Sequence, residues 1–135
     1  MVSKKKILPS QVQFPLRSPR GTQDVIPQDI KYWDYVVENA KTFFRGWHFQ
    51  QIETPLFEEI SLFTRGIGND TDIIQKELFE VKSRGKGAHY ALRPEGTASI
   101  IRSYIEHGMR SWPRPVKLFM IGSFFRYERP QAGRL

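Results

Sequence analysis

The sequence contains no cysteine, which excludes disulfides, thiolate chemistry and cysteine-based zinc sites and is compatible with a reducing compartment. No apolar run approaches the roughly 18–20 residues that a membrane span needs. The usual glycine motifs that cradle phosphates are also absent. The basic start of the chain is followed only by a broken apolar stretch, so it reads poorly as a signal peptide. These absences favour a soluble, cytoplasmic protein without a membrane partner, and no metal-binding residue is predicted.

The 135 residues fit one domain, and the hydrophobic fraction of 39% is enough for a core. The net charge of +7 lies at the two ends of the sequence. Residues 1–20 carry five basic residues and no acid, and residues 110–135 carry six basic residues and one acid. Residues 1–19 are interpreted as a basic, flexible and solvated arm, with weak attraction to a phosphate backbone as the alternative.

Strands and helices are both predicted, but they do not alternate regularly, which favours an α+β fold with an antiparallel or mixed sheet and flanking helices. In the first half of the chain, the patterns predict a helix over 28–46 that Gly46 ends, a strand over 47–55 that Pro55 ends, a short helix through 57–66 and a loop over 66–72. A hairpin follows over 76–94, with its turn at 83–88. The last predicted elements are a helix over 95–108, with Ile100, Ile101, Tyr104 and Ile105 on its buried side, and a long strand over 115–129.

The end of the last predicted strand carries charge on one face. Residues two apart share a face of a strand, so Arg126 and Glu128 continue the face of Phe124. Gly122 leaves space on the same face. A planar, permanently charged guanidinium suits a phosphate, and a nearby carboxylate can orient it or accept from an exocyclic amine. A cross-strand salt bridge at a sheet end is the alternative interpretation of this pair.

A second charged site lies in "LRPEGT", residues 92–97. Pro94 ends the hairpin strand, and Glu95 opens the next helix. A glutamate in the first helical turn often only complements the helix dipole, an effect well below about 1 kcal/mol. The functional interpretation is a carboxylate that binds an ammonium group, to which Thr97 could add a hydroxyl.

Four segments in order, "PRGTQDVIP", "TDIIQKELFEV", "LRPEGTASIIRSYIEHG" and "GSFFRYERPQAGRL", resemble the histidyl-tRNA synthetases, a family of class II aminoacyl-tRNA synthetases. The resemblance covers residues 19–135 and implies that residues 20–135 form an incomplete class II catalytic domain. "FRYERPQAGR" is similar to the family's second motif, and "GWHFQQIETP" is similar to the first. The chain would then stop within the loop of the second motif.

The resemblance implies a role for each matching residue. Arg126 would be catalytic and would hold both the ATP α-phosphate and the amino-acid carboxylate. Glu128 would bind ATP on the adenine side, and Arg134 would bind it at the phosphates. Glu95, Gly96 and Thr97 would bind histidine, with Glu95 on the α-ammonium. The motif that contains Pro55 would form the dimer.

The implied function is histidine–tRNA ligation, in which ATP activates histidine to histidyl-adenylate and the histidine passes to tRNA(His). ATP would be a substrate, Mg²⁺ a cofactor, and the complete protein a cytoplasmic homodimer. The 135-residue chain, as an N-terminal part, is expected to be inactive alone. Two alternatives stay open: a non-catalytic, histidine-sensing regulatory subunit of histidine biosynthesis, and a basic nucleic-acid-binding module.

Overall fold

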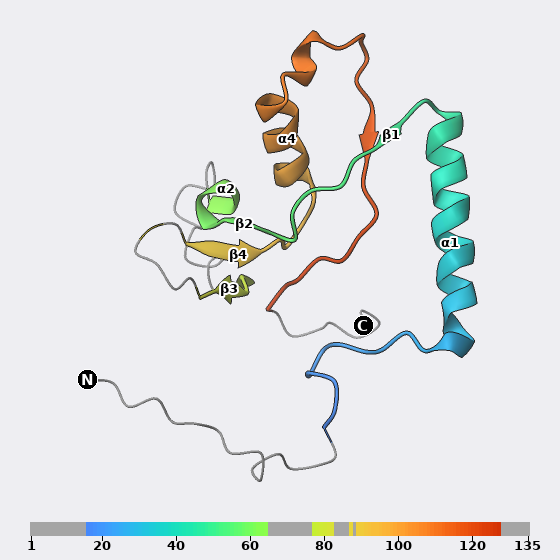
Figure 1. Cartoon of the computed structure of the whole chain (residues 1–135), viewed down its shortest axis with the longest axis vertical. Coiled ribbons are helices and arrows are strands. Elements are labelled where there is room, and N and C mark those ends of the chain that lie inside the picture. Colours follow the sequence, from blue (N-terminus) through green and yellow to red (C-terminus); the bar gives the residue numbers. More distant parts are fainter. Residues whose placement is uncertain (1–15, 65–76, 83–86, 88, 128–135) are drawn as a thin grey trace.

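A computed structural model describes residues 16–64, 77–82, 87 and 89–127 (Figure 1). The predicted loop over 66–72, most of the predicted arm and most of the hairpin turn lie outside these residues. The described elements are, in chain order, α1 (Pro27–Gly46), β1 (Gln50–Gln51), β2 (Phe57–Glu59), α2 (Ile60–Thr64), β3 (Glu80–Val81), β4 (Tyr90–Leu92), α4 (Thr97–Glu106), the 3-10 helix η3 (Met109–Ser111) and β5 (Leu118–Phe119).

The first predicted helix is confirmed as α1, which runs along one side of the molecule in Figure 1. Pro27 stands in its first turn, where a missing N–H leaves no hydrogen bond unmade. One edge of the helix packs through aromatic rings. Phe44 stacks on Phe119 of β5 with ring centroids 4.9 Å apart, and it meets Phe49 edge-on at 5.4 Å. These contacts join α1 to the β1 and β5 region.

The strands form two small sheets. β1 pairs with β5 in parallel, with Gln50 opposite Leu118. In the other sheet β4 lies between β2 and β3 and is antiparallel to both. The predicted hairpin of β3 and β4 is therefore confirmed. Parallel and antiparallel pairs together with helices confirm the α+β class.

A small core forms where α2 and the three-stranded sheet meet. Its buried side chains are Phe63, Leu78 and Ala91, and partly buried apolar side chains of α2 and α4 pack against them. Burial of this apolar surface holds α4 close to β4, and the short connection between these two elements is where the predicted glutamate lies. No described helix is both long and apolar enough to cross a membrane.

Two predictions for residues 47–66 are wrong. Residues 57–59 are not helical but form β2, because their main chain pairs with β4, with Phe57 opposite Leu92. Within the described part of this segment, the helix is limited to α2. The strand predicted to end at Pro55 is limited to β1, which ends at Gln51, because only two of its residues pair with β5. Pro55 itself is exposed in the connection between β1 and β2.

The long strand predicted over 115–129 is also wrong for its described part, in which only Leu118 and Phe119 belong to a ladder. Beyond β5 the main chain bonds to non-strand residues. The amide of Phe125 donates to the carbonyl of Arg93 at 3.0 Å, and the amide of Tyr127 donates to the carbonyl of Glu77 at 2.8 Å. Isolated hydrogen bonds of this kind hold the segment in place without making it a strand.

The buried side predicted for α4 is wrong for two of its four residues, because Ile101 is 53% exposed and Ile105 is 71% exposed. Ile100 and Tyr104 are partly buried, and the buried residues of the helix are Ser99 and Ser103. The helix packs against α2 and η3. Small side chains on this face let the elements approach closely, and two of the isoleucines remain on the outside.

Candidate active site

Glu95 and Arg126, 31 positions apart in the sequence, line one pocket of about 510 Å³. The remaining lining residues are Pro94, Gly96, Thr97 and Phe124. The connection from β4 to α4 supplies one wall, and the segment after β5 supplies the other. The structure thus brings together two predicted charged residues of opposite sign, with an aromatic ring beside them.

The carboxylate of Glu95 accepts hydrogen bonds from the first amides of α4. One oxygen accepts from the amide of Thr97, and the other accepts from the amide of Ala98 at 2.8 Å. These amides have no partner inside the helix, so Glu95 caps the helix and complements its dipole. An ionised carboxylate offers about four acceptor positions, so capping leaves room for a ligand donor. Thr97, beside it, is exposed.

The side chain of Arg126 is held against the opposite wall. Its Nε donates to the main-chain carbonyl of Pro94 at 3.0 Å. This bond fixes the guanidinium next to the residue that precedes Glu95. The pocket therefore has an anionic group at Glu95 and a cationic group that is hydrogen-bonded to the preceding residue, Pro94.

Gly96 allows the two walls to approach closely. A Cβ at this position would lie 2.5 Å from Cε of Met120 and 3.2 Å from Cε1 of Phe124, both tighter than ordinary contacts. The glycine predicted as a histidine-binding residue thus has a packing role in the structure, since it admits the segment after β5 to the start of α4.

Arg93 is a buried residue near the pocket for which the sequence predicted no role. Its side chain is 1% exposed and lies over the ring of Phe124, a residue of the pocket wall, and it donates hydrogen bonds to Thr54 and Ser123. A sequence signal does exist. Arg93 shares a strand face with Ala91, which is fully buried, so an inward-facing arginine follows from the alternation of the strand.

The other predicted site residues are not part of the described pocket. Glu128 and Arg134 lie outside the described residues. Pro55 is described but does not line the pocket. Among the described residues, no three His, Asp or Glu side chains come together to hold a metal ion, and the described pocket wall contains a single carboxylate, that of Glu95. These residues do not form a Mg²⁺ site by themselves.

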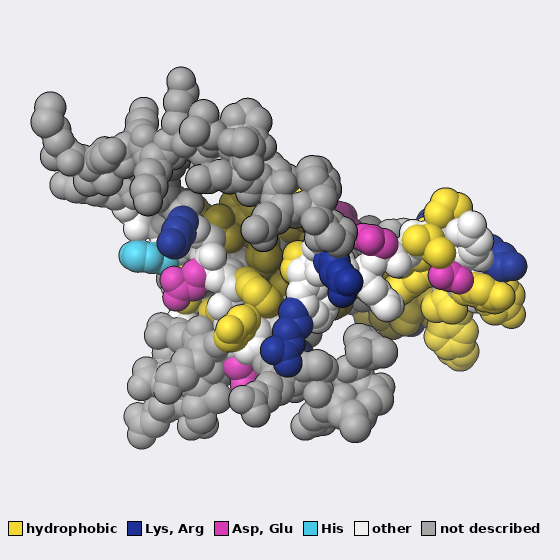
Figure 2. All heavy atoms as spheres, turned by 90° about the horizontal axis from the view of Figure 1, so that it is seen from below, with side chains coloured by type: hydrophobic (Ala, Val, Ile, Leu, Met, Phe, Trp, Pro, Cys, Tyr) yellow, Lys and Arg dark blue, Asp and Glu magenta, His cyan; other side chains and the backbone are white. Residues whose placement is uncertain are grey.

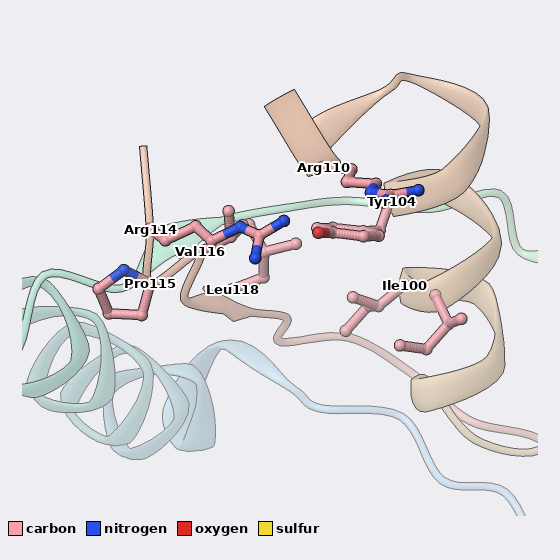
Figure 3. Close-up of a pocket in the computed structure, with 8 residues that line it drawn as sticks. Ile100, Tyr104, Arg110, Arg114, Pro115, Val116 and Leu118 are labelled. Carbon is pink, nitrogen blue, oxygen red and sulfur yellow. The ribbon is translucent and has the colours of Figure 1, made fainter. Parts of the chain in front are cut away.

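A second pocket of about 550 Å³ lies between α4 and the segment leading into β5. Figure 3 shows Tyr104 and Arg114 pointing toward one another across it, with Arg110 above and Ile100 below. Apolar side chains, including Val116 and Leu118, complete its walls. Of the residues predicted to bind histidine or ATP, none that the structure describes lines this second pocket.

Comparison with known proteins gives a consistent result. The family model for histidyl-tRNA synthetase matches residues 21–135. A histidine–tRNA ligase of Anoxybacillus flavithermus is 50% identical over 117 residues, which are 86% of this chain and 27% of that protein. Histidine–tRNA ligase 1 of Shouchella clausii is 48% identical over 121 residues, which are 89% of this chain and 28% of that protein. The chain therefore spans about 28% of the length of the curated relatives it matches.

Solved structures are similar as well. The apo histidyl-tRNA synthetase of S. aureus superposes with a TM-score of 0.70 at 38% identity, covering 84% of this chain and 30% of that one. A Bacillus halodurans protein, described as an ATP phosphoribosyltransferase regulatory subunit/histidyl-tRNA synthetase, has a TM-score of 0.68 at 23% identity. It covers 85% of this chain and 29% of that one, and at this identity it shows the fold alone.

Proposed function

Since the chain belongs to the histidyl-tRNA synthetase family, we propose that its pocket is part of an active site that activates histidine with ATP and transfers it to tRNA(His). The observation that carries the proposal is the shared pocket of Glu95 and Arg126. An amino acid presents an ammonium group beside a carboxylate, and ATP presents a phosphate. A carboxylate and a guanidinium held on neighbouring main-chain positions match these charges.

In the proposed first step, a carboxylate oxygen of histidine attacks the α-phosphorus of ATP. A new O–P bond forms, the bond to the bridging oxygen breaks, and pyrophosphate leaves with that electron pair. Negative charge builds on the α-phosphate oxygens, and Arg126 stabilises this charge because its guanidinium is already fixed by Pro94. The product is histidyl-adenylate, from which histidine then passes to tRNA(His).

Glu95 holds the histidine α-ammonium in this proposal. The carboxylate is fixed by two amides of α4, so it does not need to reorganise when the ammonium binds. Gly96 and Thr97 complete the histidine-binding stretch. Glu128 on the adenine side and Arg134 at the phosphates are proposed to bind ATP. Mg²⁺ is proposed to enter with the ATP phosphates, and no described residue is assigned to it.

The complete protein is proposed to be a cytoplasmic homodimer, with the motif that contains Pro55 at the interface. Support comes from α1, on which large apolar side chains are exposed. Figure 2 shows hydrophobic side chains gathered on the side of the molecule where α1 lies. Those of α1 include Trp33, Val36 and Phe43, each more than half exposed. A second copy would remove this surface from water.

The 135-residue chain alone is proposed to be inactive. It spans about 28% of the length of its relatives, and the polar side chains on the described pocket wall are those of Glu95, Thr97 and Arg126. Stabilising the charge on a reacting phosphate needs more convergent polar groups than these three side chains, and it needs a site that excludes water.

The experiment that tests the proposal uses a hybrid enzyme, in which residues 21–135 replace the aligned segment of the A. flavithermus relative. We expect the hybrid to catalyse ATP–pyrophosphate exchange that depends on histidine and not on other amino acids. The 135-residue chain alone should give none, and exchange by it would contradict the proposed inactivity. A folded hybrid that binds histidine without exchange would instead favour the regulatory alternative.

A further inference from the structure

Arg93 carries an unusually complete set of contacts for a buried charge. Its side chain is 1% exposed, and the guanidinium donates through all three nitrogens. Nε donates to the carbonyl of Ser123 at 3.1 Å. Nη1 donates to the carbonyl of Thr54 at 2.8 Å and to its hydroxyl at 3.1 Å, and Nη2 reaches Oε1 of Glu53 at 3.2 Å. A buried guanidinium is tolerated only when its donors are satisfied in this way.

These contacts clamp two segments that are distant in the sequence. The segment before β2 is held through Glu53 and Thr54, and the segment after β5 is held through Ser123. Gly122 makes the clamp possible, because a Cβ there would lie 2.5 Å from Nη2 of Arg93. Gly122 has no positive φ, so the reason for a glycine here is space and not backbone conformation.

The clamp lies directly behind the pocket. The guanidinium carbon of Arg93 is 5.5 Å from the ring centroid of Phe124, a residue of the pocket wall. The main-chain carbonyl of Arg93 accepts from the amide of Phe125 at 3.0 Å. The two residues that follow Arg93 are Pro94, which accepts from Arg126, and Glu95. Arg93 is therefore joined to the main chain next to both charged pocket residues: two positions before Glu95 in the sequence, and by a hydrogen bond to Phe125, the residue before Arg126.

From this geometry we infer that Arg93 is a positioning residue that sets the spacing between Glu95 and Arg126. The inference rests on the proposed function and deepens it, since it assigns a role to a residue that touches neither substrate. Histidine bound at Glu95 and ATP bound at Arg126 react only when the histidine carboxylate lies in line with the α-phosphorus. Misplacement by about 1 Å lowers such a reaction on the order of 10²-fold.

The kinetic test uses the hybrid enzyme with Arg93→Lys, which keeps a cation but removes the three-nitrogen clamp. We expect kcat for histidine-dependent exchange to fall on the order of 10²-fold, while KM for histidine stays within about threefold. The matched control is Arg102→Met, which removes a partly buried arginine that pairs with Glu58 and does not line the pocket. This control should lower stability and leave kcat per folded molecule unchanged.

Gly122→Ala provides an independent way to disturb the clamp, because its new methyl group would meet Nη2 of Arg93. We expect it to lower kcat about tenfold or more in the original background. In the Arg93→Lys background Nη2 is gone, so the same substitution should have at most a twofold effect. A merely structural role for Arg93 predicts that the two substitutions couple in stability but not in kcat per folded molecule.

A third measurement does not depend on activity. In the 135-residue chain, Arg93→Lys should speed hydrogen exchange of the Phe125 amide about tenfold, whereas Arg102→Met should not. Unchanged exchange at Phe125 overturns the positioning role even if the hybrid is inactive. An active hybrid whose kcat is unaffected by Arg93→Lys and Gly122→Ala also overturns it, while leaving the proposed function intact. An inactive unsubstituted hybrid counts against the proposed function alone.

Discussion

Arg126 donates a hydrogen bond of 3.0 Å from Nε to the main-chain carbonyl of Pro94, the residue that precedes Glu95. This single bond ties the segment after β5 to the connection between β4 and α4. It also directs the guanidinium to the same pocket as the carboxylate of Glu95. The guanidinium of Arg126 and the carboxylate of Glu95 thus line one pocket, and the predictions for these two residues depend on that arrangement.

Replacing Arg126 with alanine in the hybrid enzyme should lower the rate of adenylate formation about 10²-fold or more, because a fixed charge donor is lost. Arg126→Lys is the matched control. It keeps the charge but lacks Nε and the planar fork, so we expect an intermediate rate. Pyrophosphate exchange at saturating histidine measures both variants. Near-normal exchange by the alanine variant would refute the proposed role of Arg126.

Two substitutions separate the capping role of Glu95 from its proposed ligand role. Glu95→Gln keeps one oxygen that can accept from an α4 amide but loses the second acceptor and the negative charge. We expect it to raise KM for histidine at least tenfold and to lower stability less than Glu95→Ala does. Glu95→Ala also removes the cap and should lower the free energy of unfolding by about 1 kcal/mol. A glutamine variant with unchanged KM for histidine would leave Glu95 as a helix cap only.

The sequence predicted the elements whose signal is local. α1 carries apolar residues at helical spacing over twenty residues, and the hairpin of β3 and β4 has alternating strands on both sides of a turn. The resemblance to the family implied that Glu95 and Arg126 both hold histidine, which requires one pocket although the two residues are distant in the sequence. The structure brings these two residues together, and their catalytic and binding roles remain predictions.

The failures have one physical cause, which is that tertiary partners override local pattern. Phe57 and its neighbours look helical, yet they pair with β4. The residues after β5 look like a strand, yet the described part of the chain gives their amides only isolated partners. Arg93 was missed because its burial depends on three separate segments meeting, which the "LRPEGT" motif alone does not reveal.

The close approach at Gly96 gives a stability prediction. Gly96→Ala places a Cβ 2.5 Å from the flexible end of Met120 and 3.2 Å from the ring of Phe124. Met120 can move, but the ring is part of the pocket wall, so we expect a loss of about 1–3 kcal/mol in unfolding free energy. Gly46→Ala is the control, since a Cβ there meets nothing within 4 Å. Denaturant unfolding compares the two variants, and equal stability would contradict the packing argument.

The exposed face of α1 gives a prediction about assembly. Val36 is 61% exposed and lies on the same side of the helix as Trp33 and Phe43, at helical spacing. Val36→Glu should weaken hybrid dimers at least tenfold, because it would bury a charge at the interface. Tyr35→Glu is the control, because Tyr35 is 71% exposed on another side of α1. Analytical ultracentrifugation measures both, and equal dissociation constants would exclude this face as the interface.

The ion pair between Arg102 of α4 and Glu58 of β2 has N–O atoms 2.6 Å apart and is partly buried. The hydrogen bond with Glu58 raises the pKa of Arg102 above its ordinary value. A group whose pKa is raised by folding stabilises the fold at every pH below its pKa in the unfolded chain. For an arginine this contribution is therefore constant across the neutral pH range. A double-mutant cycle with Arg102→Met and Glu58→Gln should give a coupling of about 1 kcal/mol at pH 7.

The surface pair of Glu38 and Lys41 on α1 is the control for that cycle. Its hydrogen bond and charge attraction lower the pKa of Glu38 below the ordinary value of 4.5. A lowered carboxyl pKa stabilises the fold above 4.5, and that contribution disappears as the pH falls through the lowered value. The Glu38 coupling should therefore be lost in acid and weakened by salt, whereas the Arg102 coupling should persist in salt because Glu58 is largely buried. Cycles that respond equally to added salt would show that the Arg102 pair is no better shielded than a surface pair.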